Sequence, residues 1–168
     1  MTIDEVNNLD EAGFVAAFGF LFEHSPWIVA EAAGRRPFGD FAAMHESLMA
    51  VVADASPEAR LALVRAHPEL AGKAAIDRTL TAESTAEQAS AGLDRLTQAE
   101  YDRFHALNAA YGARFGFPFI ICVRLTDKAG ILTAMERRLA HDSDTELAEA
   151  IAQIGEIVRL RLDDRVAG

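Results

Sequence analysis

A histidine and a glutamate lie at short range in this sequence, and their side chains are suited to acid–base chemistry. His67 opens the segment HPELAGK (67–73), and Glu87 lies in the segment STAEQ (84–88). An imidazole gives and takes protons most readily near neutral pH. A nearby carboxylate can orient the imidazole and favour its charged form. The two residues together predict a site that transfers a proton.

His67 has two interpretations. Because Pro68 disfavours helical geometry at the residue before it, we expect His67 to end a helix. At that position the imidazole could do no more than interact with the helix dipole. It could also act as a general acid or base at the rim of a pocket. The spacing leaves both interpretations open.

Glu87 also has two interpretations. Ser84 and Glu87 have the spacing of a capping box, in which the glutamate binds the backbone at the start of a helix. Alternatively, Glu87 turns inward from the first helical turn and meets His67 or a ligand. The small side chains of Ala86, Ala89 and other neighbours leave room for a ligand or for close helix packing. The sequence does not choose between these.

Arg161 is the third residue of interest, because it continues the apolar stripe formed by Ile154 and Val158 at helical spacing. A guanidinium that faces inward needs an anionic partner. The alternative is that the side chain snorkels to solvent at the end of the helix.

The elements that would position these residues are predicted to be helices. Capping-box patterns occur at 2–5, 84–87, 97–100 and 143–146, and Asp10 and Ser56 are further N-cap candidates. The apolar residues between these signals follow helical spacing, and hairpin signals are absent. We therefore expect an all-α fold, a single-domain helical bundle over residues 1–168.

One stretch, FGFPFIICV (115–123), has the composition of a strand. A single strand has nothing to pair with, and Pro118 removes a backbone donor. We expect a buried extended segment between two helices. Its backbone N–H and C=O groups then need partners, and a ligand could be one of them.

Composition narrows the class of protein. The 168 residues are 51% hydrophobic, enough for one domain with a full core, and no apolar run reaches the length of a membrane span. The net charge of −10 argues against nucleic acid as a partner. An anionic ligand would need local positive potential from a few arginines or from helix N-termini.

Further signals predict the location and the absence of cofactors. The single cysteine, Cys122, excludes an internal disulfide and fits a reducing compartment. The first residues lack a signal-peptide pattern and the last are not a peroxisomal address, so we expect a cytoplasmic protein. Zinc-helix and nucleotide-binding motifs are absent, so we expect neither a metal nor a cofactor. We interpret His45 as a packing residue, and we expect His105 and His141 to be solvated.

Seven segments match a known family in order and spacing. They are FEHSPWI (22–28), RPF (36–38), AHPELAG (66–72), LT (80–81), ESTAEQASAGL (83–93), NAAY (108–111) and FGFPFIICV (115–123). Over residues 14–161 the chain thereby resembles 2-oxo-4-hydroxy-4-carboxy-5-ureidoimidazoline decarboxylase, or OHCU decarboxylase, of urate degradation. Any one of these segments would be weak evidence, whereas the set is specific.

The resemblance implies an all-α decarboxylase without a cofactor that releases CO₂ and forms (S)-allantoin. In the family, the histidine that matches His67 is the catalytic acid/base, and the glutamate that matches Glu87 assists it. The resemblance also implies a homodimer. The residues that match substrate-contacting positions are Pro68, Ser84, Thr85, Ala86, Glu87, Gln88, Phe119, Ile120, Ile121, Cys122, Val123 and Arg161.

These residue types suit the implied chemistry. Loss of CO₂ leaves an electron pair that the adjacent imine of the substrate accepts, and a fixed imidazole can then deliver one proton to one face. We expect Arg161 to orient the ring or ureido portion, since neutralising the carboxylate would hinder loss of CO₂. Two other hypotheses remain: a non-catalytic acidic helical binding module of the same fold, and a lyase or isomerase that acts on a related ureide.

Overall fold

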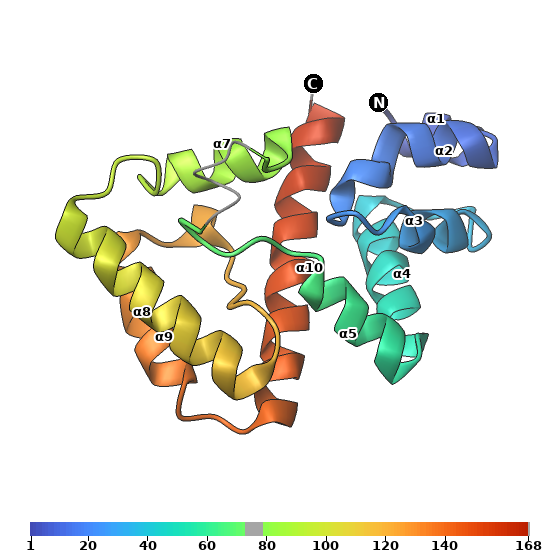
Figure 1. The fold of residues 1–168 in the computed structure, drawn as a ribbon. Coiled ribbons are helices and arrows are strands. Elements are labelled where there is room, and N and C mark those ends of the chain that lie inside the picture. The colour runs from blue at the N-terminus through green and yellow to red at the C-terminus, as the bar shows by residue number, and fades with distance from the viewer. Residues whose placement is uncertain (73–78, 168) are drawn as a thin grey trace. The chain divides into compact units, whose positions relative to one another are not determined.

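A computed structural model describes residues 1–72 and 79–167, and every regular element in these ranges is helical (Figure 1). The predicted all-α fold is confirmed. The last residue of the HPELAGK segment lies outside the described ranges. The elements are α1 (Ile3–Asn7), α2 (Glu11–Phe18), η1 (Gly19–Leu21), α3 (Pro26–Ala33), α4 (Phe41–Asp54), α5 (Pro57–Arg65), α7 (Ala82–Ser90), α8 (Gln98–Phe115), η2 (Val123–Leu125), α9 (Lys128–Arg138) and α10 (Ser143–Ala167).

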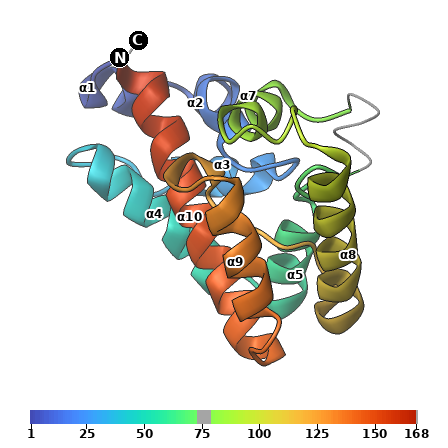
Figure 2. The same ribbon diagram turned by 90° about the vertical axis from the view of Figure 1, so that its left-hand side faces the viewer.

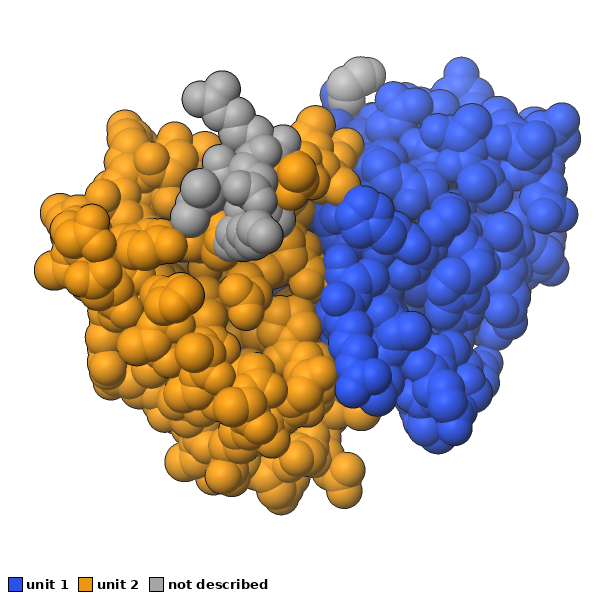
Figure 3. Space-filling model, viewed as in Figure 1, with its two compact units in different colours: residues 1–66, 154–168 blue, residues 67–153 orange. Residues whose placement is uncertain are grey.

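The chain divides into two compact units (Figure 3). Unit 1 consists of Met1–Ala66 and Ile154–Gly168, and unit 2 consists of His67–Gln153. Helix α10 therefore contributes its first part to unit 2 and its second part to unit 1. The organisation of residues 1–168 as one domain stays a prediction. In the described ranges, no helix is both long and apolar enough to cross a membrane.

Unit 1 is built on helices that pack in chain order. Helix α3 packs against both α2 and α4, around side chains such as Phe14, Phe18 and Leu48 that are fully buried. The end of α10 returns to the N-terminal helices, and both views place its last turns near the N-terminus (Figures 1 and 2). Arg165 Nε donates to the carbonyl oxygen of Ala17 at 3.1 Å and contributes to this contact.

Unit 2 is built around the long helix α8, which packs against α9. The predicted capping box of Thr97 and Glu100 is present at the start of α8. The helix ends at Gly116, which has the left-handed φ of 75° that favours glycine at this position. After it, the chain contains no strand and follows an extended course to η2, with Phe117, Phe119, Ile120 and Cys122 buried. The predicted buried extended segment is confirmed.

Two of the predicted capping boxes are wrong. Helix α7 begins at Ala82, because the side chain of Thr81 accepts from the N–H of Ser84 at 3.2 Å. Helix α10 begins with Asp142 Oδ1 accepting from the N–H of Thr145 at 2.7 Å. In both cases a good N-cap residue stands just upstream of the predicted one. Glu87 and Glu146 are therefore not the glutamates of a capping box, although their spacing predicted that role.

The prediction that His67 ends a helix is also wrong, because the helix ends slightly earlier in the sequence. Helix α5 ends at Arg65, with Ala66 as its C-cap, so His67 lies beyond the helix. The restriction that Pro68 imposes falls on His67 itself, and the last helical residue is therefore an earlier one. The N-caps predicted at Asp10 and Ser56 are confirmed.

Candidate active site

The loop that follows His67 is tied to helix α7 by one side chain. Gln88 Oε1 accepts from the N–H of Ala71 at 3.0 Å, and Gln88 Nε2 donates to the carbonyl oxygen of Glu69 at 3.4 Å. Asn108 Nδ2, on α8, donates to the carbonyl oxygen of Leu70 at 2.8 Å. Residues 69–71 of the loop are therefore held by side chains of α7 and α8, and His67 at its start is only 8% exposed.

Helix α7 presents one face to this loop. Ser84 and Gln88 are buried and Glu87 is half-buried, and these three residues share a face because of their helical spacing. Thr85 and Ala86 are exposed, and the Thr85 hydroxyl donates to the carbonyl oxygen of Thr81 at 2.9 Å. The structure thus separates the predicted contact residues of α7 into two faces.

The extended segment adds a third side to this region. Phe119, Ile120, Cys122 and Val123 are buried and Ile121 is half-buried. The segment runs directly into η2, which packs against α7. Unit 2 thus brings together the loop after His67, helix α7 and the end of the extended segment. These parts carry every predicted site residue except Arg161.

Two side chains that the sequence analysis did not single out bind the backbone of this segment. Arg138 Nη1, on α9, donates to the carbonyl oxygen of Ile120 at 2.7 Å. Gln153 Oε1, on α10, accepts from the N–H of Cys122 at 2.9 Å. The expectation that these backbone groups need partners is confirmed, and at these two positions the partners are side chains.

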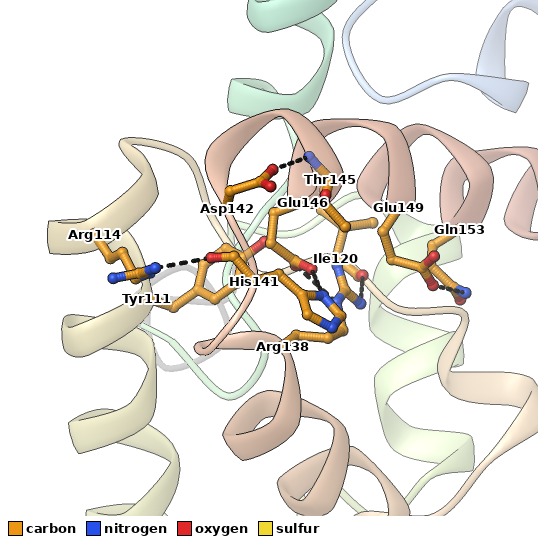
Figure 4. Close-up of polar contacts among 10 residues, drawn as sticks. All are labelled: Tyr111, Arg114, Ile120, Arg138, His141, Asp142, Thr145, Glu146, Glu149 and Gln153. Atoms are coloured by element: carbon orange, nitrogen blue, oxygen red, sulfur yellow. Dashed lines mark hydrogen bonds and ion pairs between the residues drawn. The ribbon is translucent and has the colours of Figure 1, made fainter.

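Arg138 belongs to a buried polar group that we call the Arg138 cluster: Tyr111, Arg138, His141 and Glu146 (Figure 4). Glu146 is 0% exposed, and its Oε1 accepts from Arg138 Nε at 2.7 Å and from the Tyr111 hydroxyl at 2.6 Å. His141 Nδ1 lies 2.9 Å from Glu146 Oε2, while the His141 side chain is 34% exposed, so His141 is partly solvated and also contacts the buried carboxylate. Burial, with a smaller effect from Glu146, raises the pKa of Tyr111 well above its usual value.

The sequence carried a signal for this cluster. Arg138 follows Ile131, Ala134 and Met135 at helical spacing, and Glu146 precedes Ala150 at the same kind of spacing. A charged residue on an apolar stripe was the argument for Arg161, and it applies equally to Arg138.

Arg161 lies in unit 1 and is held there by an acid. Its side chain is 4% exposed, and its Nη2 donates to Glu23 Oε1 at 2.8 Å. Its Nη1 lies 3.2 Å from the carbonyl oxygen of Phe20 and 3.4 Å from that of Leu21, and donates toward both. The predicted inward orientation with an anionic partner is confirmed, and the snorkelling alternative is wrong.

His45 lies outside the candidate site: its Nε2 is 2.8 Å from the carbonyl oxygen of Gly155, in agreement with a packing role. An open groove of about 810 Å³ borders the candidate site, because Ala71, Thr85 and Gln88 line it, whereas His67 and Glu87 do not. In residues 1–72 and 79–167, no group of three or more His, Cys, Asp or Glu side chains could hold a metal ion.

Comparison with known proteins gives consistent results. The sequence model of the family described as OHCU decarboxylase matches residues 7–163. The chain is 43% identical over 166 residues to 2-oxo-4-hydroxy-4-carboxy-5-ureidoimidazoline decarboxylase of Haloferax volcanii, covering 98% of this chain and 96% of the relative. It is 38% identical over 163 residues to the uric acid degradation bifunctional protein PucL of Bacillus subtilis, covering 97% of this chain and 32% of that protein.

Crystal structures of related proteins are similar to the chain. One, of (S)-allantoin synthase, has a TM-score of 0.75 at 27% identity and covers 98% of this chain and 54% of that one. Another, of OHCU decarboxylase in the presence of (S)-allantoin, has a TM-score of 0.73 and covers 95% of this chain and 100% of that one. Its identity of 18% makes it evidence for the fold alone. With a family match over nearly the whole chain and a relative at 43% identity, the chain belongs to the OHCU decarboxylase family.

Proposed function

We propose that the chain is a carboxy-lyase that converts 2-oxo-4-hydroxy-4-carboxy-5-ureidoimidazoline to (S)-allantoin and CO₂ in urate degradation. The names of its relatives support this reaction, and so does that of the similar (S)-allantoin synthase. The structural observation that carries the proposal is the attachment of the His67 loop to α7 through Gln88. These contacts hold the loop that begins at His67 against the helix that carries Glu87, and His67 itself is buried.

His67 supplies the proton in this proposal. The bond between the ring carbon and the carboxylate breaks, CO₂ leaves, and the electron pair moves into the adjacent imine. The imidazolium of His67 then protonates the neighbouring carbon, which was the imine carbon, and the neutral imidazole is left. The ring hydroxyl becomes a carbonyl group as its proton passes to the former imine nitrogen. A positioned proton donor of this kind contributes about 10²–10⁴ in rate. Glu87 assists by favouring the protonated imidazole.

Exclusion of water explains how a single enantiomer of the product would form. Bulk water could protonate either face of the planar intermediate, whereas a fixed imidazole reaches one face. His67 is only 8% exposed, and the aromatic side chains of Phe117 and Phe119 are buried in the same unit. The proposed substrate contacts at Pro68, the Ser84 to Gln88 turn and the Phe119 to Val123 segment come from the family resemblance.

For Arg161, we retain the proposal that it contacts the ring or ureido portion. Its charge is already balanced by Glu23 at 2.8 Å, so its attraction for the departing carboxylate is weakened. A ligand complex with a bidentate pair between Arg161 and the carboxylate would contradict this assignment.

Location and assembly are also proposed from the resemblance. We expect a cytoplasmic homodimer, and light scattering of the purified protein at micromolar concentration measures the assembly. A monomeric mass would remove the dimer from the proposal.

The decisive experiment generates the unstable substrate in situ, in the assay mixture. Urate is oxidised by urate oxidase, hydroxyisourate hydrolase acts on the product, and the protein is then added while circular dichroism is recorded. We expect fast formation of a single enantiomer of allantoin. A binding module would leave only the slow racemic background, and an enzyme for a related ureide would do the same with this substrate.

Two variants test the assigned roles in the same assay. His67→Asn should lower the enzymatic rate by about 10²–10⁴, and Glu87→Gln should lower it less. His45→Asn is the matched control, because His45 is a packing residue of unit 1. Near-normal turnover by a folded His67→Asn protein would end the assignment of His67.

A further inference from the structure

Two side chains from different helices bind successive peptide groups on either side of Ile121. Arg138, the last residue of α9, binds the carbonyl oxygen of Ile120 at 2.7 Å. Gln153, on α10, binds the N–H of Cys122 at 2.9 Å. All four residues belong to unit 2. The middle of the extended segment is therefore fastened along one edge.

The geometry of the peptide group determines what the opposite edge presents. Both peptide groups are trans, so the C=O and the N–H of each point in opposite directions. Because Arg138 and Gln153 occupy one end of each group, the N–H and the C=O of Ile121 point away from them. Within residues 1–72 and 79–167, no hydrogen bond reaches either group.

A donor and an acceptor side by side on one edge form the arrangement with which an extended chain binds another amide. The ureide groups of the proposed substrate carry the matching N–H and C=O. The position of this edge then depends on how rigidly the other edge is fastened.

Arg138 holds the extended segment rigidly, because its guanidinium has contacts on several sides. Nε donates to Glu146 at 2.7 Å, and Glu146 in turn accepts from Tyr111 and lies 2.9 Å from His141 (Figure 4). The guanidinium carbon lies 4.3 Å from the ring centre of Phe119, so Arg138 also contacts a side chain of the segment. With an exposure of 1%, the guanidinium exchanges none of these partners for water.

Gln153 is fixed by a neighbour on its own helix. Its Nε2 donates to Glu149 Oε1 at 3.1 Å, one turn earlier. This contact leaves Oε1 turned toward the N–H of Cys122. The bond to Glu149 therefore orients the side-chain amide of Gln153, and the bond from the N–H of Cys122 occupies its oxygen.

We propose that Arg138 and Gln153 are positioning residues of the decarboxylase: they hold the segment from Ile120 to Cys122 so that the backbone edge of Ile121 meets the substrate. The inference rests on the proposed function, which places this segment against the ligand. Neither residue touches the substrate in this proposal, and both act through the backbone that they bind.

The first test replaces Gln153 by alanine and measures kcat, KM and the reactivity of Cys122. Loss of one hydrogen bond should lower kcat/KM about 3- to 10-fold, mainly by raising KM. Cys122 is the only cysteine and is 2% exposed, so its rate of reaction with a thiol reagent reports the segment alone. We expect that rate to rise in Gln153→Ala, and a saturating concentration of (S)-allantoin to lower it again.

The double variant Glu149→Gln/Gln153→Glu provides the rescue. It restores an acceptor for the N–H of Cys122 and a donor one turn earlier, so kcat/KM and thiol reactivity should return toward their original values. Gln98→Ala is the matched control, because Gln98 Nε2 makes a similar bond to Asp102 at 2.8 Å on the exposed face of α8. Arg138→Lys is a second variant, which keeps a charge near Glu146 but lacks the fork that reaches Ile120.

The outcomes separate this inference from the proposed function. Unchanged kcat/KM and unchanged thiol reactivity in both Gln153→Ala and Arg138→Lys would overturn the inference. An equal loss in Gln153→Ala and in the rescue variant would also overturn it. If the unaltered protein shows no turnover, the proposed function fails, whereas the thiol rates still test the fastening of the segment.

Discussion

The role of an acidic side chain in this protein depends on where its helix begins. Glu100 and Glu146 both follow a Ser or Thr at the spacing of a capping box. Glu100 does bind the N–H of Thr97 at 3.0 Å, and hydrogen bonding to that backbone lowers its pKa. Glu146 lies in the interior with Arg138 and Tyr111 instead. One upstream residue, Asp142, accounts for the difference because it takes over the cap.

Tyr111 provides a test of the Arg138 cluster at alkaline pH. Its pKa is raised in the folded protein, first by burial and then by Glu146, so the folded state keeps the phenolic proton where the unfolded chain has lost it. The contribution of this group is therefore complete below the unfolded pKa of about 10 and declines as the pH rises above it. We expect the free energy of unfolding to fall more steeply above that pH than in Tyr111→Phe.

The measurement uses the fact that the chain has two tyrosines, Tyr101 and Tyr111. In Tyr101→Phe, absorbance at 295 nm follows Tyr111 alone, and the phenolate should form only together with unfolding. A reversible ionisation of Tyr111 near pH 10 in the folded protein would show that the hydroxyl is not buried against Glu146. Near neutral pH, Tyr111→Phe should cost about 1.5–3 kcal/mol for a bond to a charged group.

At the scale of the element, the start of α7 decides the geometry of the candidate site. If Ser84 capped the helix, Glu87 would bind the backbone of the first turn and could not assist His67. Because Thr81 caps it, Glu87 lies further along the helix, on the face that also carries Gln88. The same face holds the loop after His67.

We therefore predict that Thr81→Ala destabilises the protein by about 0.5–2 kcal/mol, and that Thr81→Ser restores the stability. The free energy of unfolding in urea measures the loss, and amide exchange should speed up first in the opening turn of α7. Thr97→Ala, which removes the cap of α8, is the matched control. Unchanged exchange in α7 after Thr81→Ala would refute this start of the helix.

At the scale of the whole molecule, unit 1 is closed by a contact between distant parts of the chain. Glu23 and Arg161 are separated by 138 residues, and both are almost completely buried. Arg161 also binds the carbonyl oxygens of Phe20 and Leu21, so it joins α10 to η1. Removing one partner from such a pair leaves a buried charge without compensation.

We predict that Arg161→Met or Glu23→Gln alone destabilises unit 1 by about 3–5 kcal/mol. The double variant should lose less than the sum, with a coupling of about 0.5–3 kcal/mol. Urea unfolding followed by fluorescence measures this, because the single tryptophan, Trp27, lies in α3 of unit 1. The exposed pair of Arg35 and Asp54 is the control and should show a coupling of about 0–1 kcal/mol. Purely additive losses for Arg161 and Glu23 would contradict the interpretation.

Features that depend on neighbours within a turn or two could be predicted from the pattern of residues. Helical periodicity and the N-caps at Asp10, Ser56 and Thr97 are of this kind. The buried extended course after Gly116 also follows from local composition, because the segment is apolar and has no second strand to pair with. The family resemblance added the expected chemistry of His67 and Glu87.

Contacts between groups that are distant in the chain could not be predicted in this way. The cap of α7 was predicted at Ser84, whereas in the structure Thr81 caps the helix. Glu23 as the partner of Arg161, and Arg138 as the partner of the Ile120 carbonyl, depend on how separate helices pack. The physical reason is that a buried charge or backbone group requires some partner, whereas its own surroundings in sequence do not specify which one.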